Sequence, residues 1–313
     1  MVQRINRTND YAFKRIMGSE EGKEALIGFL NAVLKPGPGK KLTSVQLLDR
    51  ELDPRYLLDR AARLDILAQT AAGALINIEV QIANQYNIDK RTLYYWAGLY
   101  YGQLSSGENF RRLRKTITIN ILGFGWFAGK NKYHHIFQLR EKDTGELLND
   151  DIEIHFLELP KIMELDRRPN DALEEWMLYL NNLEGKEMEE IAMSNPGIKK
   201  ALTIEQIFQK NKRERRVYEL REKAYRDELS ALAGARAEGE AAGEARGEAK
   251  GRQEAICKYL EARFGDKSQP LQEKVKQHNE IEKLDKIINK IYTVRSLEEA
   301  GAVINGTGSA YFD

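Results

Sequence analysis

The chain has 313 residues, of which 49 are lysine or arginine and 48 are aspartate or glutamate, so its formal net charge is only +1. This balance excludes binding to nucleic acid through overall basicity, and any such surface must be a local patch. The single cysteine, Cys257, excludes an internal disulfide and a cysteine-rich zinc site. With no signal sequence and no apolar run of membrane-spanning length in view, we expect a cytoplasmic protein with no membrane partner.

The first half of the sequence alternates between helical and strand patterns. We expect helices over residues 9–34 and 88–104 and strands over residues 43–51, 63–70, 74–82 and 115–123. Strands near 133–142 and 151–159 extend the sheet, and helices then run over residues 171–232 with a break at residues 195–197. This order predicts an α/β (α+β) fold with a mixed central sheet followed by C-terminal helices.

Two acidic residues stand out in the hairpin formed by the second and third strands. With its turn centred near Ala72, Asp65 and Glu79 share one face and lie directly opposite each other, with Cβ atoms about 5 Å apart. Carboxylates so close repel each other unless a cation lies between them, and Mg²⁺ and Mn²⁺ prefer such oxygen ligands. Spacing alone leaves two interpretations open, a metal site and a solvated hairpin face.

A low-complexity segment follows the helices, over residues 234–252. Glycine recurs there every fourth residue, at positions 239, 243, 247 and 251. Each glycine costs a solvated helix about 1 kcal/mol relative to alanine, whereas a stripe of small residues permits close packing between helices. The segment is therefore either a self-association helix or a linker.

The tail over residues 253–304 carries an apolar stripe of helical period, sufficient for a small bundle or for dimerisation. We accordingly divide the chain into a domain over residues 1–232, a glycine-rich helical linker or oligomerisation segment over residues 233–252, and a small helical module over residues 253–313. A homo-oligomer formed through the glycine-striped helix and the C-terminal helices is expected.

Short segments spread over the first two thirds of the chain form a characteristic series. They are residues 9–14 (NDYAFK), the strand of Asp65, the triplet at 79–81 (EVQ), and residues 91–95 (RTLYY), 115–124 and 158–161. In order and spacing the series resembles the recombination-promoting nuclease/transposase family of the PD-(D/E)XK nuclease superfamily. The resemblance implies a restriction-endonuclease-like core and a Mg²⁺-dependent DNA endonuclease. The helix and strand order expected above agrees with that core.

The resemblance also implies roles for individual residues. Asp65 and Glu79 would bind Mg²⁺ or Mn²⁺, and the main-chain carbonyl of Val80 would complete the coordination. Gln81 would take the place of the motif lysine; a neutral amide can orient the attacking water but supplies no charge, so activation would fall mainly to the metal. The proline that precedes the aspartate in the superfamily motif is absent here.

Other residues are candidates for the same site. Asp10 lies where the first helix of such nucleases often brings an acidic residue near the metal, although it equally suits a helix N-terminus. Arg91 and Tyr95 are four residues apart and share a helix face. The residues that we expect to contact DNA phosphates are Lys14, Arg91, Tyr95, Arg112 and Arg114.

The neutral side chain of Gln81 leaves a second function open. A catalytically weak or inactive protein on the same fold, acting by binding DNA or as an oligomeric scaffold, agrees with the same residues. Retention of DNA without cleavage in Mg²⁺ and Mn²⁺ distinguishes this alternative from a nuclease.

Overall fold

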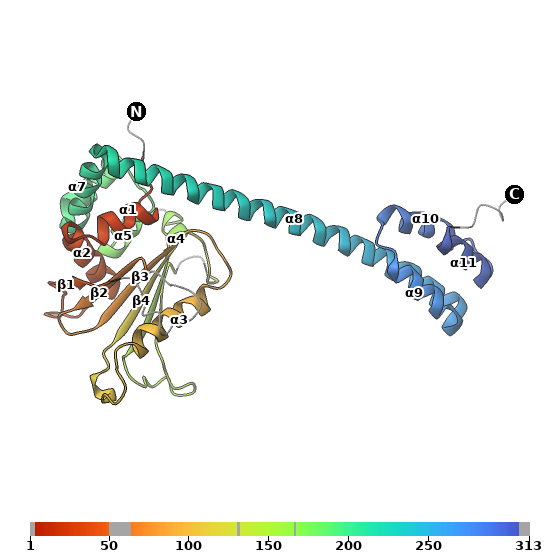
Figure 1. The fold of residues 1–313 in the computed structure, drawn as a ribbon, viewed down its shortest axis with the longest axis horizontal. Helices are drawn as coiled ribbons and strands as arrows, with labels where there is room; N and C mark the ends of the chain where they lie inside the picture. The colour runs from red at the N-terminus through yellow and green to blue at the C-terminus, as the bar shows by residue number, and fades with distance from the viewer. Residues whose placement is uncertain (1–3, 50–63, 130–131, 166, 307–313) are drawn as a thin grey trace. The chain divides into compact units, whose positions relative to one another are not determined.

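A computed structural model describes residues 4–49, 64–129, 132–165 and 167–306 (Figure 1). The chain forms two compact units, Met1–Tyr225 and Arg226–Asp313. The predicted strands 43–51 and 63–70 both extend into residues 50–63, which lie outside the described residues.

Among the described residues, a six-stranded mixed sheet forms the centre of the first unit, with the strand order β1-β2-β3-β4-β6-β5. Strands β1 to β4 are labelled in Figure 1. The strands are β1 (Val45–Leu47), β2 (Ile66–Thr70), β3 (Leu75–Gln81), β4 (Thr116–Leu122), β5 (His134–Phe137) and β6 (Ile152–Glu158). β3, β4 and β6 run parallel, whereas β1, β2 and β3 form an antiparallel meander and β5 pairs antiparallel with β6. The predicted α/β (α+β) fold with a mixed sheet is confirmed.

Helices cover both faces of this sheet. They are α1 (Asp10–Met17), α2 (Lys23–Leu34), α3 (Ile88–Tyr101), α4 (Leu159–Met163), α5 (Ala172–Leu180), α6 (Lys186–Ser194) and α7 (Pro196–Lys210). Isoleucines at alternate positions of β3 and β4 form the main core with α1, α2, α5 and α7. The break predicted at residues 195–197 is confirmed, because α6 ends at Ser194 and α7 begins at Pro196.

The opposite face of β3 and β4 is polar but buried beneath α3. Trp96 Nε1 donates to the carbonyl oxygen of Thr116 at 2.9 Å, and Asn120 Nδ2 donates to Thr92 Oγ1 at 2.9 Å. Glu79 on this face is only 4% exposed. A solvated hairpin face is therefore excluded for Glu79.

The helix predicted over residues 9–34 is in fact two helices, α1 and α2, joined through a short 3-10 helix, Glu20–Gly22. Ser19 initiates this turn, since its hydroxyl oxygen accepts the main-chain N–H of Gly22 at 3.1 Å. A Cβ atom at Gly22 would lie 2.0 Å from the carbonyl oxygen of Ile16, so only glycine permits the turn. The single-helix prediction is wrong because the apolar periodicity continues across the turn.

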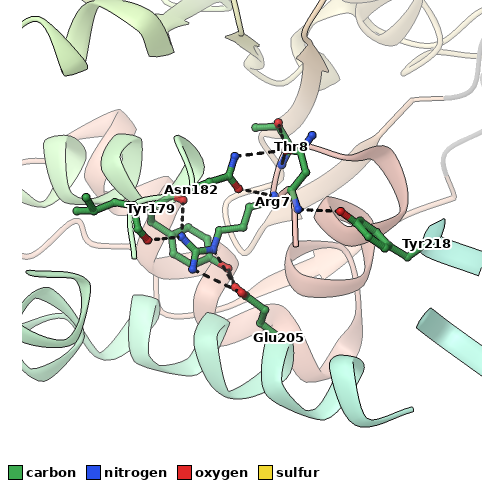
Figure 2. Close-up of polar contacts among 8 residues, drawn as sticks. Arg7, Thr8, Tyr179, Asn182, Glu205 and Tyr218 are labelled. Carbon is green, nitrogen blue, oxygen red and sulfur yellow. Dashed lines mark hydrogen bonds and ion pairs between the residues drawn. The ribbon is translucent and has the colours of Figure 1, made fainter. Parts of the chain in front are cut away.

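Arg7 anchors the segment that leads into α1 (Figure 2). Its guanidinium is buried, donates from Nε to Glu205 Oε2 at 2.8 Å, and lies 4.3 Å from the centroid of the Tyr179 ring. It also donates from Nη1 to the carbonyl oxygens of Tyr179 and Leu183, while the Arg7 main-chain N–H donates to Asn182 Oδ1. These bonds hold the start of α1 against α5 and α7.

Helix α8 (Lys212–Phe264) begins in the first unit and ends in the second. The second unit also contains α9 (Gln269–Gln277), α10 (Ile281–Ile291) and α11 (Leu297–Asn305). Its separate apolar core includes Ile256, Leu260, Val275, Leu284, Ile287, Ile291 and Ile304.

The glycine-striped segment lies within α8, and residues 230–248 are all exposed. A Cβ atom at any of the four stripe glycines would meet no atom of the described residues within 4 Å. Within the described part of the chain, no helix combines the length and apolar character needed to cross a bilayer.

Candidate active site

The carboxyl end of β3 brings the two predicted acidic residues together. The antiparallel ladder pairs Ile66 with Ile78, and this register, continued by one residue, places Asp65 opposite Glu79 as predicted. The Asp65 main-chain N–H donates to Glu79 Oε1 at 3.4 Å, and the Val80 N–H donates to Asp65 Oδ2 at 2.9 Å. Each carboxylate is thus held by the backbone of the neighbouring strand.

The side chain of Glu79 is buried with a second carboxylate beside it. Burial and, to a smaller extent, the charge of Asp65 raise the pKa of Glu79 to about 7, although the nearby Arg91 guanidinium acts in the opposite direction. Arg91 Nη2 lies 3.3 Å from Glu79 Oε2. A carboxyl group with such a pKa exchanges its proton readily near neutral pH, as is common at functional sites.

Helix α1 supplies a cation to the other carboxylate. Lys14 Nζ lies 2.9 Å from Asp65 Oδ1 and also forms an ion pair with Asp10, one turn earlier in α1. Burial lowers the pKa of Lys14, but Asp65 and Asp10 outweigh that effect, so the pKa is raised above its ordinary value. The structure therefore brings Asp10 and Lys14 to the hairpin, although the sequence alone did not indicate that Lys14 pairs with Asp65.

Helix α3 contributes from the other face of the sheet. Arg91 lies in its first turns, and its guanidinium is 5.3 Å from the centroid of the Tyr95 ring. The two side chains therefore share a helix face, as the spacing predicts. Tyr95 also packs against the small apolar cluster of Leu64, Leu67 and Leu99. Its position is thus fixed by packing, with Arg91 between it and Glu79.

Gln81 ends β3 and is buried, with 7% of the residue exposed. Neither the amide oxygen nor the amide nitrogen has a hydrogen-bond partner among the residues that the structure describes. Since strand side chains alternate, Gln81 lies on the same face as Glu79. A buried amide without partners is unfavourable by about 1–3 kcal/mol, so it is suited to a ligand or water that reaches this face.

The oxygen donors of this site fit a hard divalent cation. Two carboxylates, from Asp65 and Glu79, lie side by side, and the Val80 main chain faces Asp65. Across the described ranges, no three or more His, Cys, Asp or Glu side chains are grouped so that they could hold a metal ion. A site with two carboxylates suits Mg²⁺ or Mn²⁺, which keep several waters, better than a fully protein-ligated zinc ion.

Two predicted phosphate contacts lie elsewhere. Because β4 runs parallel to β3, Arg112 and Arg114 precede β4 at the end of the sheet where β3 begins. The Arg114 side chain lies beside Gly73 in the β2–β3 turn, and Arg112 forms an ion pair with Glu108. β3 has 7 residues, which separates these arginines from the acidic residues by roughly 20 Å. The structure does not bring them to the site.

Comparison with known proteins agrees with this arrangement. A family model described as PD-(D/E)XK nuclease family transposase matches residues 7–235, which include the whole sheet, α1, α3 and the acidic hairpin. No curated protein and no solved structure matches the chain significantly. Since the match covers more than half of the sequence, the chain belongs to the PD-(D/E)XK nuclease family transposases.

Proposed function

We propose that this protein is a Mg²⁺- or Mn²⁺-dependent DNA endonuclease of the recombination-promoting, transposase-like type. The observation that carries the proposal is the pair of a half-buried Asp65 and a buried Glu79 near the carboxyl end of β3, contacted by cations from two helices. Family membership supports a nuclease, and the donor set supports a hard divalent metal. DNA is then the substrate and the cytoplasm the expected location.

The residues of the site have separate tasks in this proposal. Asp65, Glu79 and the Val80 carbonyl would hold the metal, which when bound activates water and neutralises phosphate charge. With no partner among the described residues, the Gln81 amide offers a donor and an acceptor to the attacking water, so it would orient that water without changing its charge. Arg91, stacked beside Tyr95, is placed to bind a non-bridging phosphate oxygen.

Cleavage of supercoiled plasmid by the purified protein tests the proposal. We expect nicking in Mg²⁺ or Mn²⁺ and none in EDTA. Asp65→Asn keeps a side-chain oxygen for the Val80 N–H but lacks the charge that binds metal, so we expect at least a 100-fold loss of rate, and Asp65→Ala is expected to be inactive. Asp143→Ala, at an exposed turn before β6, is the matched control and keeps the wild-type rate.

Two outcomes would contradict the proposal. Cleavage by Asp65→Asn at the wild-type rate would show that the hairpin is not the site. Wild-type protein that retains DNA in a filter-binding assay but cuts in neither metal would instead support the inactive DNA-binding alternative. Tryptophan fluorescence of each variant shows whether the fold is retained.

Self-association is the second part of the proposal. Helix α8 exposes residues 230–248 in a single chain, and a solvated helix that contains several glycines is marginal in water. Pairing of the glycine-striped segment with a second copy would stabilise it. The C-terminal helices, which have their own apolar core, would contribute further contacts to this self-association.

A further inference from the structure

A lysine ammonium contacts the candidate metal ligand Asp65. Lys14 Nζ lies 2.9 Å from Asp65 Oδ1, while the other oxygen, Oδ2, accepts the Val80 N–H at 2.9 Å. Both carboxylate oxygens therefore have partners from the protein. A cation that binds Asp65 through Oδ1 must compete with the ammonium for that oxygen.

The contact between Lys14 and Asp65 matters because the reaction needs a positive charge near the phosphate. Phosphodiester hydrolysis increases negative charge at phosphorus, which a positioned cation stabilises. β3 offers no such cation, because a neutral amide occupies position 81. Two helices supply cations to this strand end instead, Arg91 of α3 beside Glu79 and Lys14 of α1 beside Asp65, and Lys14 is the one that contacts the less buried carboxylate.

The surroundings of Lys14 allow its ammonium to move. Its side chain is 18% exposed and has four rotatable carbon–carbon bonds, so the ammonium can change its partner by rotation of the side chain. Asp10, one helical turn away and 48% exposed, forms the second ion pair with Lys14. Asp10 thus keeps the ammonium near the site when Asp65 releases it.

We propose that Lys14 is a catalytic residue which takes the place of the metal on Asp65 in the metal-free protein and binds the scissile phosphate once the metal has displaced it. This inference rests on the proposed nuclease function. The ammonium exchanges one ion pair, with Asp65, for another, with a non-bridging phosphate oxygen. It stays protonated throughout, so the exchange makes or breaks no covalent bond and requires no further reactant.

Lys14→Met tests the inference, because methionine keeps the aliphatic stem and removes the charge. Mn²⁺ binding to the DNA-free protein, measured by loss of the free-ion electron paramagnetic resonance signal, is expected to tighten at least fivefold. The rate of plasmid cleavage at saturating Mn²⁺ is expected to fall at least tenfold. Lys14→Arg keeps the charge, so we expect Mn²⁺ affinity and cleavage closer to wild type than with methionine.

The control is Lys23→Met at the start of α2, a lysine paired with Glu20. It is expected to change neither measurement. Unchanged or weaker Mn²⁺ binding by Lys14→Met would contradict the proposed competition between Lys14 and the metal for Asp65. An unchanged cleavage rate would contradict the catalytic role of Lys14. A Lys14→Gln variant repeats both measurements should the methionine variant unfold on tryptophan fluorescence.

Failure of the proposed function would look different. In that case the wild-type protein neither cuts DNA nor binds Mn²⁺ through Asp65, and Asp65→Asn leaves Mn²⁺ binding unchanged. If the wild-type protein binds Mn²⁺ and cuts DNA and the Asp65→Asn variant does neither, the proposed function holds. The two Lys14→Met measurements then test only the role of Lys14.

Discussion

Glu79→Gln is expected to stabilise the metal-free protein at alkaline pH. The folded chain keeps a proton on Glu79 up to a pKa of about 7, whereas the unfolded chain releases it near 4.5. The unfolded state therefore binds fewer protons in this window, and the Glu79 contribution to stability decreases as pH rises from about 4.5 to 7. At about 1.4 kcal/mol per pKa unit, the free energy of unfolding of the wild type decreases by about 2–3 kcal/mol between pH 5 and pH 8, a decrease that the glutamine variant does not show.

Urea denaturation at pH 5 and pH 8 in EDTA measures this difference. All three tryptophans, at positions 96, 126 and 176, lie in the first unit, so their fluorescence reports its unfolding. Glu24→Gln, on the exposed side of α2, is the control, and we expect its stability relative to wild type to be the same at both pH values. An equal stability difference between wild type and Glu79→Gln at both pH values would refute the burial and charge argument for this carboxyl group.

Two further predictions concern the framework of the molecule. Arg7→Met leaves the buried Glu205 carboxylate without its cation, so we expect urea denaturation to show that the free energy of unfolding falls by about 3–5 kcal/mol. An unchanged free energy of unfolding would contradict the anchoring role of Arg7. Gly243→Ala combined with Gly247→Ala should increase helicity by circular dichroism but dissociate the oligomer in light scattering, whereas Gly234→Ala, outside the stripe, should leave it assembled. A monomeric wild-type protein would contradict self-association through this segment.

Local patterns were sufficient to predict the acidic hairpin. β-branched residues alternate with polar ones in β3, and the short turn after Thr70 permits little choice of register, so the opposition of Asp65 and Glu79 was predictable. The turn between α1 and α2 could not be predicted from such patterns. It depends on the contact between Gly22 and the Ile16 carbonyl, which apolar periodicity does not encode.

Contacts between distant segments were the least predictable. Arg112 and Arg114 are closer in sequence to the acidic pair than Lys14 is, yet they lie at the far end of the sheet. The reason is that α3 returns the chain to the starting end of β3 before the parallel strand β4 begins. Lys14 precedes Asp65 by 51 positions in the sequence and still contacts it, because α1 packs at the end of the hairpin.

The polar face of β3 shows why burial marks the site better than the sequence pattern does. Alternating polar and apolar residues normally predict a strand with one solvated face. Here α3 covers that face, so Glu79 has a raised pKa and the Gln81 amide lacks hydrogen-bond partners among the described residues. Both features are unfavourable for folding, and no apolar contact requires a carboxyl group or an amide at these positions. The proposed binding or catalytic task would account for them, since a cation would neutralise the carboxyl group and an oriented water would supply the partners that the described residues do not give the Gln81 amide.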